Sequence, residues 1–188
     1  MFHMIQNCSI WRVFLVFAKN PTKRHHIRQI SREIGLASTS VKRHIDKLIE
    51  EELVAEKKDV FKYYSACSDN ASFVFYKKLA NQIFLEESGL INYIDSVCTP
   101  DVIMLFGSFA SGMDVESSDV DIYVQSGECS LNLDKYEKKI GRTIEVIFSD
   151  KIEDLPVNLA NSILNGVRLK GFINAKIGTQ SRKIKKHL

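Results

Sequence analysis

Proline and glycine are scarce in this sequence, at 3 and 9 of 188 residues, whereas 45% of the residues are hydrophobic and 26% are charged. This composition excludes collagen-like and intrinsically disordered proteins. No apolar run approaches the ~20 residues that a membrane-spanning helix needs. The apolar stretch 10–18 is interrupted by Arg12 and has no signal-peptide cleavage pattern. We therefore expect a cytoplasmic globular protein with no membrane partner.

The cysteines are also few, and they lack a metal-binding pattern. Cys8, Cys67, Cys98 and Cys129 are 59, 31 and 31 residues apart, with no CxxC pair and no histidine at ligand spacing. We expect all four to be reduced thiols with a structural role.

The net charge of +3 is the sum of three regions whose signs alternate along the chain. Twelve Lys and Arg against seven Asp and Glu give residues 1–68 a charge of +5, residues 69–174 carry −7, and the last fourteen residues carry +5. A basic region suggests a polyanionic partner, and an acidic region that handles phosphates needs metal ions. At roughly 100–150 residues per domain, the length allows two small domains, and the charge distribution favours them.

Two short amphipathic segments occupy the front third of the chain. The apolar residues between 27 and 36 have the spacing of one helix face, and Gly35 is typical of a helix C-terminus. The hydroxyl residues at 38–40 offer N-caps for a second helix, whose apolar stripe spans 41–49. Two helices joined by a tight turn, the second rich in cations and hydroxyls, indicate a helix-turn-helix.

Residues 53–55 and 60–64 are rich in β-forming side chains and flank a polar turn at 56–59, which predicts a two-stranded wing. Residues 8–67 together resemble the winged helix-turn-helix domain of small prokaryotic, especially archaeal, regulators. In that family the second helix enters the major groove of double-stranded DNA and wing lysines touch the backbone. The resemblance implies DNA contacts from Thr39, Ser40, Lys42, Arg43 and Lys47, and phosphate contacts from Lys57, Lys58 and Lys62. The alternative use of such a domain is dimerisation or protein docking.

Apolar residues recur at spacings of three and four from 72 to 87, which predicts a strongly amphipathic connecting helix. Its apolar face is expected to comprise Phe73, Tyr76, Leu79, Ala80, Ile83 and Phe84. This face can pack on either domain, or on a second copy of the chain to give a homodimer.

Two predicted strands carry the residues that point to chemistry. The buried strand 102–106 is followed directly by Gly107 and Ser108, and a second strand covers 119–124. Side chains alternate along a strand, so Asp119 and Asp121 project from one face, where they repel each other and can chelate a hard divalent cation. Gly107 lets a backbone N–H approach a phosphate, and the Ser108 hydroxyl adds a donor. These features describe a metal–triphosphate site.

Gly107-Ser108, ten intervening residues and Asp119-x-Asp121 resemble the signature of the DNA polymerase β superfamily, in its minimal nucleotidyltransferase form. The resemblance covers 90–174 and implies a mixed β-sheet flanked by helices. It also implies a third carboxylate on the neighbouring strand, for which Glu145 in the segment 143–148 is the candidate. In one respect the chain departs from the family pattern Gly-Ser-x-Ala-Arg-Gly, because Ser111 stands in place of the arginine. Arg142, Arg168 and Lys170 are candidates to supply the missing charge.

The expected architecture is therefore α+β in two domains. A winged helix-turn-helix at 1–68 is followed by the connecting helix at 69–89, the nucleotidyltransferase domain at 90–174 and a basic tail at 175–188. The resemblance implies that Asp119, Asp121 and Glu145 are catalytic residues that hold two Mg²⁺ ions, while Gly107 and Ser108 bind a nucleoside triphosphate, expected to be ATP. The nucleotide would be transferred to a hydroxyl acceptor, which a partner protein could present.

Two other functions remain open at this point. In one, the protein is a transcriptional regulator whose nucleotidyltransferase-like domain senses nucleotide or dimerises. In the other, it is an antitoxin-like protein that modifies a partner toxin. Ser111 favours the regulator, whereas retention of Ser108 and both aspartates favours an enzyme.

Overall fold

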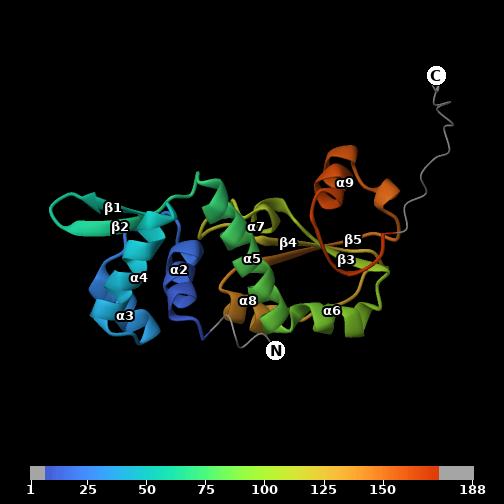
Figure 1. Cartoon of the computed structure of the whole chain (residues 1–188). Coiled ribbons are helices and arrows are strands. Elements are labelled where there is room, and N and C mark those ends of the chain that lie inside the picture. The colour runs from blue at the N-terminus through green and yellow to red at the C-terminus, as the bar shows by residue number, and fades with distance from the viewer. Residues whose placement is uncertain (1–6, 174–188) are drawn as a thin grey trace, which may run out of the picture.

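The computed structural model describes residues 7–173, which form two packed regions bridged by one long helix (Figure 1). The predicted tail at 175–188 lies outside the described residues, as do the first six residues of the predicted winged-helix domain. Within the described part, no helix has the length and apolar character needed to cross a membrane.

The first region consists of three helices and a two-stranded antiparallel sheet. Its elements are α2 (Ser9–Lys19), α3 (Ile27–Ile34), α4 (Ser38–Glu50), β1 (Val54–Lys58) and β2 (Lys62–Ala66). Phe17, Ile30 and Ile45 bring the three helices together in one fully buried cluster, which the strands cover through Val54 and Tyr64. The predicted pair of helices and the predicted wing are both present in this region.

Two details of the predicted winged helix were wrong. The wing turn lies at 59–61, because Lys58 pairs with Lys62 across the ladder, so Lys57 and Lys58 belong to β1 and not to the turn. The residue before α4 is Ala37, and no side chain caps this helix, so none of the hydroxyls at 38–40 is its N-cap.

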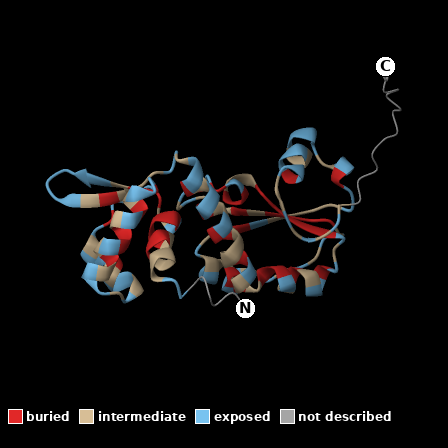
Figure 2. Ribbon diagram, in the orientation of Figure 1, coloured by how far each residue is buried: buried red, intermediate tan, exposed pale blue. Residues whose placement is uncertain are grey.

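The second region is a four-stranded mixed sheet with the order β5-β4-β3-β6. Its strands are β3 (Val102–Phe106), β4 (Val120–Val124), β5 (Ile144–Phe148) and β6 (Val167–Gly171). β3 runs antiparallel to β4 and β6, whereas β4 and β5 are parallel. β3 and β4 are almost entirely buried, as expected for the inner strands of a covered sheet (Figure 2).

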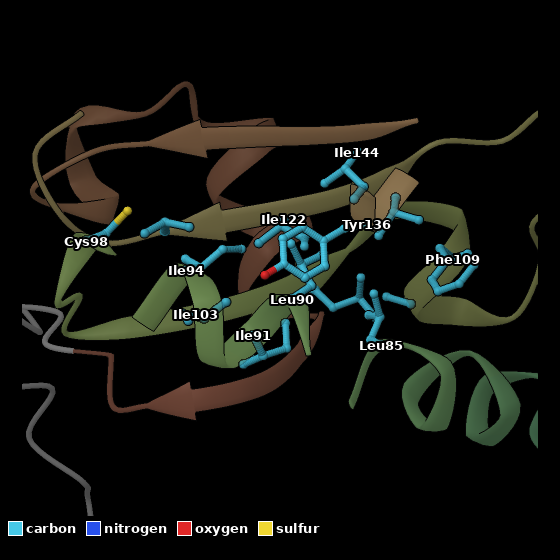
Figure 3. Packing of buried hydrophobic residues seen from close by; sticks show 14 residues of the cluster. Leu85, Leu90, Ile91, Ile94, Cys98, Ile103, Phe109, Ile122, Tyr136 and Ile144 are labelled. Carbon is cyan, nitrogen blue, oxygen red and sulfur yellow. The ribbon is translucent and has the colours of Figure 1, made fainter. Parts of the chain in front are cut away.

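Each face of the sheet has its own helices. On one face, Ile103, Ile122 and Ile144 pack against α6 (Leu90–Cys98) and α8 (Asp134–Ile140) (Figure 3). On the other face, Met104 and Tyr123 pack with the 3₁₀ turn η1 (Ile152–Asp154) and with α9 (Val157–Leu164). A short helix, α7 (Gly107–Ser111), follows β3 directly.

The connecting helix is α5 (Ala71–Ser88), a single helix that ends at Gly89 in the left-handed conformation. Its first turn belongs to the first region, where Phe73 is buried, and its last turns belong to the second, where Leu85 is buried. The predicted apolar face was wrong in part. Tyr76 and Leu79 are 41% and 38% exposed, while the polar residues Lys77 and Asn81 are buried in their place.

Lys77 is buried because it meets a carboxylate from the loop after α7. Its ammonium lies 3.1 Å from the carboxylate of Asp114, and both side chains are about 2% exposed or less. Arg142 approaches the second carboxylate oxygen at 3.2 Å, and the Asn81 amide donates to the first at 2.8 Å. Asp114 therefore joins α5, the α7–β4 loop and the segment between α8 and β5.

The same loop also contacts the first region. The backbone N–H and the hydroxyl of Thr22 donate to the Glu116 carboxylate at 3.2 and 2.8 Å. A weaker contact of 3.5 Å joins the Arg142 guanidinium to the carbonyl of Lys19 at the end of α2. The α7–β4 loop thus contacts α5 on one side and the first region on the other.

We expect Asp114→Ala to lower the free energy of unfolding by about 3–5 kcal/mol, because it leaves the Lys77 ammonium buried without a counter-charge. Glu116→Ala, in the same loop, removes only exposed contacts and should cost less than about 1 kcal/mol. Urea unfolding of the two variants measures both values. Equal losses would show that the Lys77–Asp114 pair does not hold this loop.

Candidate functional site

The parallel pairing of β4 with β5 brings two of the predicted carboxylates together. Asp121 is directly opposite Glu145 in the ladder, so their side chains are neighbours on one face of the sheet. Asp119 lies just before β4, two residues from Asp121, and shares this face by alternation. Asp119 and Asp121 are half-buried, whereas Glu145 is exposed. The structure thus places all three residues at one end of the sheet, where the strands β4 and β5 begin. We call this end of the sheet the carboxylate edge.

Gly107 completes this edge from β3. Phe106 pairs with Asp121, so the chain leaving β3 passes directly over the aspartate. Gly107 has a φ of 71°, and a Cβ there would lie 2.0 Å from the Asp121 Oδ2 atom. Glycine suits this position, because the φ lies in the left-handed region and because a Cβ would displace the Asp121 carboxylate from where it lies. Ser108 follows as the second residue of α7 and is half-buried.

The carboxylates interact electrostatically. The pKa of Asp121 is raised, first by burial and then by the negative charges of Glu145 and Asp119. Among residues 7–173, no Lys or Arg forms an ion pair with any of the three. The edge therefore carries uncompensated negative charge in a partly desolvated place.

The side chains of Asp119, Asp121 and Glu145 carry the kind of ligand atoms that a hard divalent cation binds. All three offer carboxylate oxygens, the ligands that Mg²⁺ prefers, and a cation would offset the burial and the repulsion that together raise the pKa of Asp121. In the part of the chain that the structure describes, no three His, Cys, Asp or Glu side chains converge closely enough to form a ready-made metal site. Binding would therefore require side-chain movement, for which the exposed Glu145 is free to adjust.

The three cations considered as replacements for the missing arginine are already engaged. Arg142 pairs with Asp114 at 3.2 Å, and Lys170 pairs with Asp95 at 2.5 Å. Arg168 donates to the carbonyl of Gly171 at 3.3 Å and lies over the ring of Phe172. None of them compensates for Ser111 in this structure.

The predicted DNA-contacting residues of α4 differ in availability. Thr39, Arg43 and Lys47 are exposed, and neither cation has an ion-pair partner within residues 7–173. Ser40 is half-buried, and Lys42 is paired with Asp46 one turn further along the helix. Arg43 and Lys47 are therefore the free cations of this helix.

The wing presents a second group of cations. Lys57 and Lys58 are exposed on β1, while Lys62 on β2 is held 2.7 Å from Glu56. This pairing raises the pKa of Lys62 and lowers that of Glu56. At the wing tip, Val60 and Phe61 are 79% and 76% exposed, a feature that the β-forming pattern concealed because it placed both residues inside a strand.

The histidines near this region have structural roles. His25 pairs with Tyr64 in an isolated bridge, and its ring contacts the carbonyl of Asn20 at 3.0 Å. His44 is buried against the Ser9 hydroxyl at 2.8 Å, and burial together with Arg43 and Lys47 lowers its pKa. His25 and His44 are thus buried, whereas His26 is exposed.

Comparison with known proteins identifies the first region. Residues 22–55, which include α3, α4 and the start of β1, match the family described as winged helix-turn-helix DNA-binding. No curated protein and no solved structure matched the chain. The N-terminal region is thus a winged helix-turn-helix, and the match supports binding to double-stranded DNA.

We expect Asp121→Asn to raise the melting temperature at pH 7, because it removes a carboxylate that burial and two neighbouring negative charges disfavour. The folded protein binds this proton more readily than the unfolded chain. The stabilisation by Asp121→Asn is therefore fully present above the pKa that Asp121 has in the folded protein. It disappears as the pH falls below the pKa of an aspartate in the unfolded chain, about 4. Thermal unfolding at pH 7 and pH 3 measures the difference.

Asp69→Asn serves as the control, because Asp69 is exposed in the turn before α5 and should show no such gain. A lower melting temperature for Asp121→Asn at pH 7, or a gain of equal size at pH 3, would contradict the electrostatic account.

Arg43→Ala and Lys47→Ala should each weaken DNA binding about three- to tenfold and reduce the slope of log K against log salt by about 1, because each removes a free cation from α4. Fluorescence anisotropy with a labelled duplex at several salt concentrations gives both quantities. Lys151→Ala, a matched loss of charge beyond the end of β5, should change neither. Unchanged slopes for the α4 variants would place the DNA on another face.

Proposed function

We propose that the protein binds double-stranded DNA through its winged helix and that its C-terminal region is a Mg²⁺-dependent nucleotidyltransferase. The observation that carries the second part is the edge where Gly107 lies against Asp121 and Asp121 lies opposite Glu145. An edge of this kind suits a ligand that brings both phosphates and divalent cations. The sequence resemblance described above suggests a nucleoside triphosphate, with ATP as the expected substrate.

Asp119, Asp121 and Glu145 would hold the cations. When bound, Mg²⁺ supplies stabilisation of the negative charge on the entering and departing oxygens. The backbone at Gly107 can come close to a phosphate because no Cβ intervenes, and the Ser108 hydroxyl can donate to a phosphate oxygen.

The reaction would join a hydroxyl acceptor to the nucleotide. The acceptor oxygen forms a bond with the α-phosphorus, the bond from that phosphorus to the bridging oxygen breaks, and pyrophosphate leaves. Glu145 is the candidate to receive the acceptor proton, since it is exposed and adjacent to Asp121. The C-terminal region is small, which favours an acceptor presented by a partner protein or by a second subunit.

A second candidate is a regulator that binds the nucleotide without transferring it. Ser111 and the winged helix-turn-helix match favour this function, because a sensor needs a DNA-binding region but not a full set of transition-state contacts. An antitoxin-like protein that modifies a partner toxin is a special case of the first candidate, with the toxin as acceptor.

Transfer of label from α-labelled ATP to material in a host lysate, in the presence of Mg²⁺, tests the proposal. Asp119→Asn and Asp121→Asn should each reduce transfer at least about a hundredfold, because each removes a charged ligand from the site. Asp69→Asn should transfer as the wild type does. Full activity in Asp121→Asn would exclude this edge as the active site. Binding of Mg·ATP without transfer by the wild type would favour the regulator.

A further inference from the structure

A hollow of about 340 Å³ with mixed polar and apolar walls is lined in part by Gly107. Its lining comes from three separate parts of the chain: Gly107 and Ser111 of α7, Asn165 and Gly166 after α9, and Lys78 of α5. Gly107 is therefore shared between this hollow and the carboxylate edge, because the same residue lies against Asp121. A ligand in the hollow would be a close neighbour of the carboxylates.

Lys78 is the charged residue of this lining. It is half-buried and, unlike that of its neighbour Lys77, its side chain makes no ion pair or hydrogen bond with any residue between 7 and 173. Its ammonium therefore has no counter-charge among the described residues and is available to a bound anion.

The backbone of Lys78 is held firmly beside α7. Gly112 packs against α5 so closely that a Cβ there would lie 2.6 Å from the carbonyl of Val74 and 3.1 Å from the backbone nitrogen of Lys78. One turn further along α5, the Asn81 amide donates to the carbonyl of Phe109 at 2.9 Å. The position of Lys78 beside Ser111 is thus a consequence of how α5 packs, and not of a flexible loop.

The opposite wall is equally close. A Cβ on Gly166 would lie 2.3 Å from the carbonyl of Leu105, so the chain between α9 and β6 passes directly over the end of β3. This approach brings the side chains of Asn165 and Ser162 to the hollow that Gly107 lines. The lining therefore combines one cation with hydroxyl and amide groups, the chemistry that suits a phosphate chain.

The geometry points to this hollow as the binding site for the polyphosphate of the nucleotide, with Lys78 supplying the cation that Ser111 does not. This inference rests on the proposed function of the carboxylate edge and deepens it. The cation comes from the connecting helix, outside the region 90–174 that resembles a minimal nucleotidyltransferase. The helix that leads out of the winged helix would thus complete the nucleotide site.

Binding of inorganic tripolyphosphate to the full chain in EDTA, followed by calorimetry, tests the inference without involving metal or transfer. Lys78→Gln should bind about tenfold more weakly than the wild type, because it loses one charged contact to the anion. Lys151→Gln, the matched charge loss at the opposite end of the sheet, should bind as the wild type does. Ser111→Arg introduced into Lys78→Gln should restore binding, because it returns a cation to the same hollow.

Wild-type affinity in Lys78→Gln, or no binding by the wild type, would overturn the inference. The transfer assay separates this result from failure of the proposed function. If the wild type transfers label and Lys78→Gln does so with an unchanged KM for ATP, the hollow is not the phosphate site, but the proposed nucleotidyltransferase activity is supported. If neither the wild type nor Lys78→Gln transfers label while tripolyphosphate binding depends on Lys78, the proposed activity is contradicted and the anion-binding site is supported.

Discussion

The carboxylate of Asp114 receives two cations that arrive from different parts of the fold. Lys77 comes from the helix that leads out of the winged helix, and Arg142 comes from the segment that leads into β5. A buried lysine and a buried aspartate are each unfavourable alone, so neither α5 nor the α7–β4 loop can leave this arrangement without leaving the other's charge buried and unpaired. The pair therefore fixes where α5 lies against α7, and with it the side of the sheet on which the two regions meet.

This placement gives α5 a part in both regions. Phe73 packs into the core of the winged helix, while Leu85 packs into the core beneath the sheet, less than four turns later. Between them, Lys77 and Asn81 hold the loop that leads to Asp119, and Lys78 faces the hollow beside Gly107. α5 is thus one continuous helix that contacts both the winged helix and the proposed nucleotide site.

Local patterns in the sequence predicted the strands β3, β4 and β5, whereas the second wing strand was predicted at 60–64 and lies at Lys62–Ala66. The apolar run 102–106 favoured a buried strand, which the structure confirms, and alternation placed Asp119 and Asp121 on one face before any pairing was known. The burial of Lys77 could not be predicted in this way, because its counter-charge lies 37 residues further along the chain. The same limitation hid Lys78: only the packing of α5 on Gly112 brings it to the hollow that Ser111 lines. The alternation of a strand and the three- and four-residue spacing of a helix show which side chains share a face. They do not show which distant segment of the chain covers that face.

Two aspartates only seven residues apart are treated very differently by this fold. Asp114 is almost fully buried and receives two cations and an amide, so its charge is compensated in every direction. Asp121 is half-buried beside two further carboxylates and receives no Lys or Arg from residues 7–173. The fold therefore neutralises the buried Asp114 carboxylate with cations of its own. The Asp121 carboxylate, which lies against Gly107 with no Lys or Arg of residues 7–173 paired to it, is therefore the physical basis on which we propose a bound cation at this place.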